Sequence, residues 1–535
     1  MEIFGKYKGK MLFVVGMIVL LLTSACSTRN NEGANNQAQE SNPPASTAAD
    51  SSANDTKDPY NDLPKTVSIS MFDRGKVSSD EGTYEENRWV DWIRKESGID
   101  VSIIPVPRSQ AKDKLNVLIA SNQAPDLIWE FDRSYIGKLV TQGALQPIGE
   151  YIEKYSTSYK KYLEENPELL PHITFDGKIY AVTTKRPITA IANHGMWIRQ
   201  DWLDALNLKA PTTVDELIAV AQAFKKHYPD STPIVGANTS DIYAALHGAI
   251  NYQWYVEEDK LKYGATLDRF ADVIEMEKKL FDLKLVDLEY FTDTNYQRSN
   301  QLWTTGKAGI MLGQWLTPLN KDLITNVPSA NPVPLEAVST PYGKYGLYQE
   351  ASPFIYVAFN KNMKNPKAAV EYLDWIVDKG WFTLLNGEEG VHHQLVDGVA
   401  KRLDMDKYNK EASYAAEYAV LRQETVKPED LILQAADDEL SQRIAKLNSA
   451  ALETALKVPF RRDIPYQPNF DEINEIRASL DKFIKEIRAG ATTQGEKYNG
   501  EWALGEIRKE WERLGGAKAE EIANQWYQNN KASFK

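Results

Sequence analysis

The stretch Phe175–Leu208 reads FDGKIYAVTTKRPITAIANHGMWIRQDWLDALNL. It begins with Asp176–Gly177, a dipeptide that favours a tight turn. Two apolar, strand-like runs follow, interrupted at Lys185–Arg186–Pro187, and the second leads into a helix at Arg199–Trp202. Because proline cannot donate a hydrogen bond to a sheet, the interruption predicts that the chain leaves one domain here and enters another. The alternative is a bent strand within a single sheet.

Strand-like and helical patterns alternate in the residues before this stretch. Apolar residues mark strands at 67–71, 101–106 and 127–129, with helical stripes between them. This alternation predicts an α/β sheet with parallel strands, whose ligands bind beyond the carboxyl ends of the strands. Two polar segments, Asp73–Arg74 and Trp129–Arg133, lie at such strand ends and are therefore candidate ligand contacts.

Four segments resemble one protein family. Within Phe175–Phe224, the sequence GKIYAV, a proline, and then WIRQDWLDALNLKAPTTVDEL is similar to the family 1 extracellular solute-binding proteins of ABC transporters, in particular to their LipO-like lipoprotein group. The other similar segments are Lys114–Trp129, Leu302–Trp315 and Asn365–Trp375. The resemblance implies an α/β, two-lobed periplasmic-binding-protein-like fold (type II), with hinge strands between the lobes.

The hinge sets the expected domain boundaries. Lobe 1 is expected at 65–187 plus about 353–430, and lobe 2 at 188–352 plus about 431–535. The lobes are expected to pivot at 181–191, and the chain to return through a second crossover at 345–360. An apolar stripe from Ile473 to Ile487, and a helical pattern from Trp502 to Tyr527, predict a helical C-terminal region.

The resemblance also implies ligand contacts after the third strand. Maltose-type binding proteins present a tryptophan, an aspartate and an arginine to sugar hydroxyls there, which points to Trp129, Asp132 and Arg133. A carboxylate accepts hydrogen bonds from hydroxyls, a guanidinium donates in a fixed fork, and an indole packs on the apolar face of a pyranose. Asp132 is also placed to cap the helix that follows, and the two roles are compatible.

Three more residues complete the candidate site. In the family, the tryptophan after the strand at Leu302–Trp315 stacks on sugar, which implies that role for Trp315, with a core position as the alternative. Trp254 lies in an aromatic and polar run suited to a cleft wall. Arg186 lies with Lys185 at the hinge, and if both face the cleft they favour an acidic sugar such as a uronate.

These features predict a protein that closes two lobes over an oligosaccharide and delivers it to the permease subunits of an ABC importer. Two other classes stay open. One is a glycan-active enzyme at the cell surface. Such an enzyme needs a pair of carboxylates, but with 75 Asp and Glu residues the sequence singles out no pair. The other is a ligand receptor for a membrane sensor. We expect a monomer without catalytic residues or a cofactor. A net charge of −13 argues against nucleic acid as a partner.

The first 64 residues are expected to export and tether the protein. Residues 1–26 combine a basic start with an apolar run at Met11–Leu22, which is typical of a signal peptide. Small residues before Cys26, the single cysteine, resemble a lipobox and predict lipidation of its sulfur, with a free thiol as the alternative. The polar segment 27–64 predicts a disordered tether. We therefore expect a lipid anchor on the extracellular face of a Gram-positive cell membrane.

No metal site is expected. Many relatives carry a calcium loop after the first helix of lobe 2, whereas this chain has HYPDSTP at His227–Pro233, without the alternating oxygen ligands or the glycine of such a loop. The adjacent His392 and His393 end a loop motif, NGEEGVHH, whose role the residues do not reveal. Adjacent histidines on a helix do not share a face, which argues against a shared metal.

Overall fold

The computed structural model describes residues 58–534, except 237–238, 290, 294 and 349. The predicted signal peptide, Cys26 and residues 27–57 of the predicted tether lie outside the described residues. Within the described part, none of the helices combines the length and the apolar character needed to cross a membrane.

A five-stranded sheet organises the first body of the protein. Its order is β2-β1-β3-β13-β6. The first three strands along the chain are parallel, as the alternating pattern predicts, and β13 is antiparallel to both of its neighbours. The strands are β1 (Thr66–Asp73), β2 (Asp100–Pro107), β3 (Leu127–Glu130), β6 (Ala181–Val182) and β13 (Tyr356–Phe359).

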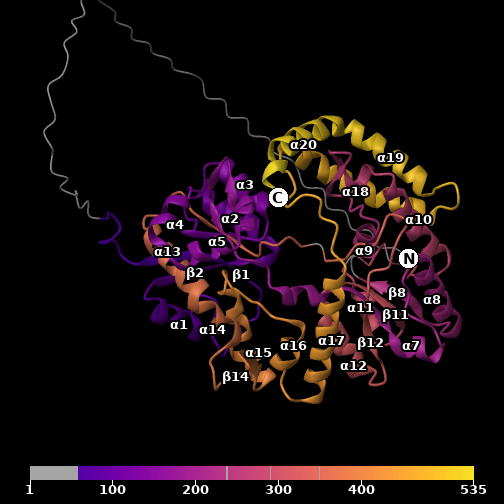
Figure 1. The fold of residues 1–535 in the computed structure, drawn as a ribbon, viewed down its shortest axis with the longest axis horizontal. Coiled ribbons are helices and arrows are strands. Elements are labelled where there is room, and N and C mark those ends of the chain that lie inside the picture. The colour runs from indigo at the N-terminus through magenta and orange to yellow at the C-terminus, as the bar shows by residue number, and fades with distance from the viewer. Residues whose placement is uncertain (1–57, 237–238, 290, 294, 349, 535) are drawn as a thin grey trace, which may run out of the picture. The chain divides into compact units, whose positions relative to one another are not determined.

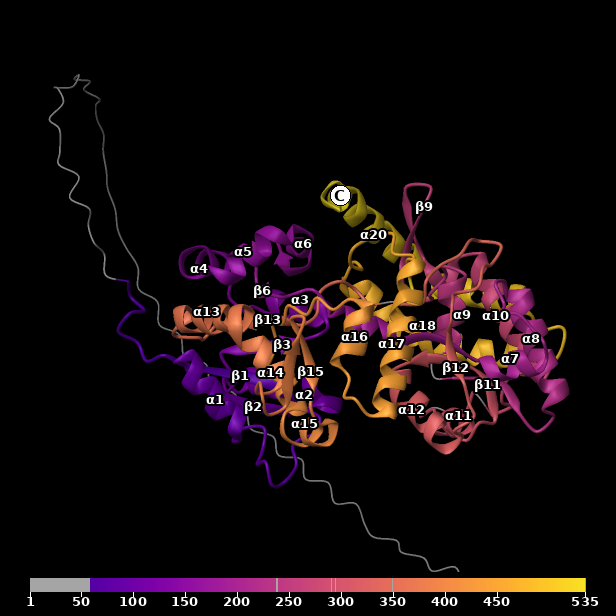
Figure 2. The same cartoon turned by 60° about the horizontal axis from the view of Figure 1, so that its bottom comes forward.

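Helices from two distant parts of the sequence surround this sheet. Figures 1 and 2 show α13, from the later part, beside α4 and α5 from the earlier part. The turn at Asp176–Gly177 joins a short hairpin, and both of its residues have positive φ angles. The helices are α1 (Arg88–Ser97), α2 (Ala111–Ala120), α3 (Arg133–Thr141), α4 (Gly149–Tyr155), α5 (Ser158–Glu165), α6 (Leu170–Ile173), α13 (Pro366–Trp375), α14 (Trp381–Asn386) and α15 (Met405–Glu411), and the hairpin strands are β4 (Thr174–Phe175) and β5 (Lys178–Ile179).

A four-stranded sheet of order β12-β7-β11-β8 organises the second body. Its central strand β11 is parallel to β8 and antiparallel to β7. The strands are β7 (His194–Arg199), β8 (Thr232–Gly236), β11 (Ala308–Gln314) and β12 (Pro332–Leu335), with a separate hairpin of β9 (Trp254–Glu257) and β10 (Lys260–Tyr263). The helices that follow these strands are α7 (Gln200–Ala205), α8 (Val214–His227), α9 (Thr239–Leu246), α10 (Arg269–Asp282), α11 (Gln297–Thr304) and α12 (Leu316–Asn326).

The C-terminal region is helical, as predicted. The predicted helix from Trp502 to Tyr527 is divided at Gly515, whose φ of 93° ends one helix before the next begins. The helices are α16 (Pro428–Gln434), α17 (Glu439–Lys457), α18 (Asp471–Thr493), α19 (Gly500–Arg513) and α20 (Gly516–Asn530). A bidentate ion pair joins α18 to α10: the guanidinium of Arg488 donates from Nε to Glu277 over 2.9 Å and also from its outer nitrogen.

The hydrophobic cores of the two bodies are separate. The buried side chains of the first core come from residues 67–182 and 355–421, and those of the second body come from 192–338 and 451–527. This membership supports the predicted lobe boundaries at 187/188, 352/353 and 430/431, which stay a prediction.

Two of the three segments that pass between the bodies lie side by side. One runs from β6 to β7 and the other from β12 to β13. The backbone N–H of Arg186 donates to Ser352 over 2.6 Å, and the N–H of Phe354 donates to Thr184 over 2.8 Å. The Arg186 guanidinium adds hydrogen bonds to the carbonyl oxygens of Ala351 and Pro353. Arg186 therefore fastens the two connecting segments to each other.

The last seven residues of the predicted tether, 58–64, are not free but lie on the first body. The ring of Tyr60 meets the rings of Tyr151 and Tyr155 edge-on, with centroids 6.2 and 6.1 Å away. Asn365 donates to the carbonyl of Pro64 over 3.0 Å. The prediction was wrong for this segment because its one aromatic residue finds an aromatic site that only the folded helices create.

Candidate functional site

The carboxyl ends of β1, β2 and β3 form one edge of the first sheet, which we call the first edge. Three aromatic rings lie in a row along it: the centroid of Phe131 is 5.8 Å from that of Phe72 and 5.5 Å from that of Phe354. The exposed Arg108 stacks over Phe72, with its Cζ 4.5 Å from the ring centroid. We call Phe72, Phe131 and Phe354 the aromatic row. Phe72 is 0% exposed and supports the row from below, whereas Phe131 and Phe354 are half-buried and, with the cationic neighbours, suit the apolar and polar faces of a sugar.

Trp129 lies beneath the aromatic row rather than in it. Its side chain is 1% exposed, and its ring packs on Phe72 with centroids 4.4 Å apart. An indole covered in this way has no free face for a sugar, so the structure does not support the predicted stacking role. The physical reason is that Trp129 is inside β3, where neighbours from β1 cover it.

Asp132 and Arg133 both make contacts within the protein. The Asp132 carboxylate caps α3 by accepting from the N–H of Ser134 over 2.8 Å, and it also accepts from Lys112 over 2.6 Å. Arg133 donates to three backbone carbonyls, and its guanidinium lies over the rings of Phe175 and Tyr466 at 4.3 and 4.1 Å. The capping alternative therefore holds for Asp132, whereas Arg133 ties the first body to the segment before α18.

Asp73 and Arg74 are exposed at the end of β1, as predicted. The Asp73 carboxylate accepts from the N–H of Gly75 over 2.8 Å, which shapes the turn. Arg74 forms an ion pair with Glu417 at 2.9 Å. Both side chains remain on the first edge, within the candidate site.

At the hinge, the two predicted cations are paired. Lys185 forms an ion pair with Glu168 at 2.6 Å, and Arg186 forms one with Glu350 at 3.2 Å. Their positive charges are therefore compensated in this structure. The contacts of Arg186 hold the two connecting segments together.

Trp315 stands at the carboxyl end of β11 in the second sheet. The predicted signature is confirmed around it: α11 ends, Gly306 turns with a φ of 73°, and the buried strand β11 leads to the tryptophan. Trp315 is 57% exposed and has a φ of 58°, a left-handed conformation that is strained for a bulky residue. By contrast, Trp254 is 2% exposed and packs against Tyr263 and Trp511, so it belongs to the core and not to a cleft wall.

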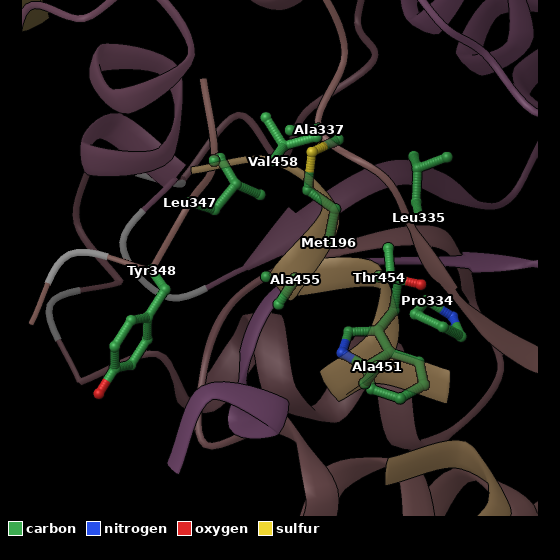
Figure 3. Close-up of a pocket in the computed structure, with 13 residues that line it drawn as sticks. Met196, Pro334, Leu335, Ala337, Leu347, Tyr348, Ala451, Thr454, Ala455 and Val458 are labelled. Carbon is green, nitrogen blue, oxygen red and sulfur yellow. The ribbon is translucent and has the colours of Figure 1, made fainter. Parts of the chain in front are cut away.

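A small cavity lies elsewhere in the second body. It has a volume of about 30 Å³ and is lined mainly by apolar residues of β7, β12 and α17. Figure 3 shows Met196, Ala337 and Val458 gathered there, while the ring of Tyr348 points away. Ligand sites for small molecules are commonly ten times larger, so this cavity is a packing gap.

The ammonium of Lys225, in the last turn of α8, reaches into the loop that follows this helix. It donates to the carbonyl oxygens of Pro229 and Ser231 over 2.8 and 2.7 Å. In the described part of the chain, no group of three or more His, Cys, Asp or Glu side chains is placed to hold a metal. The expectation that this loop binds no calcium stays a prediction, and Lys225 gives it a physical basis.

We expect EDTA to leave the melting temperature unchanged, because an ammonium already satisfies the loop carbonyls. Replacing Lys225 with methionine should lower the free energy of unfolding by about 1–2 kcal/mol, since two charge-assisted hydrogen bonds are lost. The exposed neighbour Lys226, replaced in the same way, is the control. Thermal melts with EDTA and with added calcium test both points; a calcium-dependent rise would contradict them.

His172 is buried beside Arg133. Burial, with the nearby charges of Arg133 and Arg462, lowers the pKa of His172 to about 3. The folded protein therefore holds this histidine neutral, while the unfolded chain protonates it near pH 6.5. Stability from this group is complete above about pH 6.5 and falls as the pH drops towards 3.

The expected loss is about 1.4 kcal/mol per pH unit below 6.5 for this histidine alone. Urea denaturation at pH 7, 6 and 5 measures it. A His172→Gln variant should show a shallower dependence on pH than the unaltered protein, whereas His227→Gln, at an exposed position, should not. Equal slopes for all three proteins would contradict the prediction.

The NGEEGVHH motif has a structural role. His392 accepts from the N–H of Glu388 over 3.0 Å through Nδ1, and its Nε2 lies 3.4 Å from the carboxylate of Glu411. Gly387 has a φ of 77°, and a Cβ there would stand 2.6 Å from the His392 ring. The motif thus builds a closed loop around a neutral histidine.

Sequence reasoning missed part of the first edge. Phe131 belongs to the candidate ligand segment Trp129–Arg133, but Phe354 and Arg422 come from distant segments. The guanidinium of Arg422 lies 4.4 Å from the centroid of Phe354. The pairing of β13 with β3 brings Phe354 to Phe131, and the residues around Phe354 contain no pattern that predicts this pairing.

Two sheets joined by two connecting segments, each with candidate residues beyond its strand ends, are the features of a two-lobed binding protein. The bacterial extracellular solute-binding protein family matches residues 82–381, more than half of the chain, and the chain belongs to this family. This is a family of binding proteins rather than enzymes. It confirms the predicted family and the two-lobed type II α/β fold.

Curated relatives are moderately similar. The polygalacturonan/rhamnogalacturonan-binding protein YtcQ of Bacillus subtilis is 27% identical over 325 residues, covering 58% of this chain and 64% of that protein, just under two thirds of its length. Lipoprotein LipO of the same organism is 24% identical over 476 residues, covering 82% and 88%. The fructooligosaccharide-binding protein FusA of Streptococcus pneumoniae is 29% identical over 223 residues, covering 37% and 41%.

Solved structures share the fold. An HMO-binding, ABC-transporter-associated solute-binding protein of Bifidobacterium longum infantis has a TM-score of 0.68 at 18% identity, covering 87% of this chain and 99% of that one. The alginate-binding protein AlgQ2 has a TM-score of 0.64 at 19% identity, covering 88% and 99%.

Proposed function

We propose that this chain is the substrate-binding component of an ABC importer and that it captures an oligosaccharide without altering it. Trp315 carries the proposal. A large aromatic ring that is more than half exposed, on a strained backbone at a strand end, costs stability and is retained where it contacts a ligand. Within the aromatic row on the first edge, the half-buried rings of Phe131 and Phe354 offer further apolar surface.

The relatives support the same class of ligand. YtcQ is named for binding polygalacturonan and rhamnogalacturonan, and FusA is named for fructooligosaccharides. We propose that the bound sugar is handed to permease subunits, and that the protein acts as a monomer. We also propose that a lipid on Cys26 holds it at the extracellular face of the cell membrane, which the lipoprotein relative LipO supports.

A carbohydrate screen tests the proposal. Purified protein is melted with plant, fungal and bacterial oligosaccharides, and a ligand that binds only the folded state raises the melting temperature in a saturable manner. Chromatography of the recovered sugar should show it unchanged. If no carbohydrate stabilises the protein, or if the sugar is cleaved, the proposal is wrong.

A further inference from the structure

Arg422 lies at the first edge, in the loop before α16. Its guanidinium stacks on Phe354, the last ring of the aromatic row, on which Arg186 also lies, with Cζ distances of 4.4 and 5.7 Å from the ring centroid. Arg422 therefore adjoins the surface that we assign to the sugar.

The Arg422 guanidinium donates no hydrogen bond to any residue that the structure describes. Its Nε is buried without a hydrogen-bond partner, and its one ion pair in the described structure is a loose contact of 4.0 Å with Glu424. Arg186 differs, because each of its donor nitrogens has a protein acceptor nearby. Only 18% of the Arg422 side chain is exposed, and burial lowers its pKa.

Burying the Arg422 guanidinium in this way costs folding free energy. A guanidinium removed from water without hydrogen bonds loses its hydration and gains little in return. Glu417 is engaged by Arg74 at 2.9 Å and Glu350 by Arg186, which leaves Glu424 as the nearest compensating charge. A planar fork held against an aromatic ring, with free outer donors, fits a carboxylate in a bidentate manner.

We infer that Arg422 binds the carboxylate of an acidic sugar, so that the ligand is a uronate-containing oligosaccharide. This inference rests on the proposed function and gives it a substrate class. The reason for an acidic sugar is therefore no longer the hinge pair, because Lys185 and Arg186 are both paired, whereas Arg422 has donors to offer.

The test compares an oligogalacturonate with its methyl ester, in which a methyl group removes each negative charge, by calorimetry at fixed ionic strength. The unaltered protein should bind the acid at least tenfold more tightly than the ester. Arg422→Gln should remove that preference by weakening binding of the acid at least tenfold and binding of the ester by a smaller factor. Arg513→Gln, on a distant exposed helix, is the control.

The melting temperature separates a ligand contact from a structural role. Because Arg422 makes no hydrogen bond to another described residue, Arg422→Gln should melt at or above the temperature of the unaltered protein; a fall would indicate a structural arginine and overturn the inference.

Other outcomes are equally decisive. Tight binding of neutral glycans without binding of the acid would overturn the inference and leave the proposed function intact. Stabilisation by inorganic phosphate that matches the acid would assign Arg422 to a free anion instead. Failure of every carbohydrate to bind would overturn both proposals.

Discussion

Replacing Trp315 with glycine is expected to weaken carbohydrate binding by 30-fold to 1,000-fold, or about 2–4 kcal/mol, without lowering the melting temperature. The ring is 57% exposed, so its loss uncovers little of the core. Glycine adopts the left-handed φ of 58° freely, which relieves backbone strain and should raise stability by about 1 kcal/mol. Calorimetry and thermal melts of the same samples measure both effects.

Trp254 supplies the matched control. It is 2% exposed and packed between aromatic rings, so Trp254→Ala should lower the free energy of unfolding by about 3–5 kcal/mol. The substitution at Trp315 is thus expected to lower affinity but not stability, and the substitution at Trp254 is expected to lower stability. A Trp315→Gly variant that keeps full affinity, or that melts markedly lower, would show that Trp315 is not the ligand platform.

Replacing Glu277 with alanine is expected to lower the free energy of unfolding by about 3–5 kcal/mol. Glu277 and Arg488 have side chains that are 1% and 8% exposed, and their pairing is bidentate. Removing the carboxylate deprives the buried Arg488 guanidinium of its bidentate counter-charge. Guanidinium chloride denaturation measures the loss.

Two comparisons make this second result specific. The double variant Glu277→Leu/Arg488→Met should recover most of the lost stability, because a buried apolar pair avoids the desolvation cost of both charges. The exposed pair of Glu510 with Arg513 on α19 is the surface control, and Glu510→Ala should cost less than about 1 kcal/mol. Equal losses at the buried and the exposed pair would contradict the argument.

Features determined by neighbouring residues in the sequence were predicted well. The three parallel strands of the first sheet follow from apolar alternation, and the passage between sheets follows from the proline at 187. The Asp132 cap and the strand before Trp315 are equally local. In each case the deciding residues lie within a few positions of the feature.

Features determined by distant contacts were not predicted. Trp129 and Trp315 both stand at strand ends. The ring of Phe72, from β1, covers Trp129, whereas Trp315 remains exposed to solvent. Arg133 could point to a ligand until the carbonyls of α6 and the ring of Tyr466 engage it. Phe354 and Arg422 reach the site only through the return of the chain to the first sheet.

The docked segment 58–64 has a mechanical consequence. Its contacts are with the first body, through Tyr60, Asn365 and their neighbours. A lipid on Cys26, as proposed, would therefore connect to the folded protein through the first body alone. The second body would have no direct attachment to the membrane, so it could move relative to the first body without displacing the anchor.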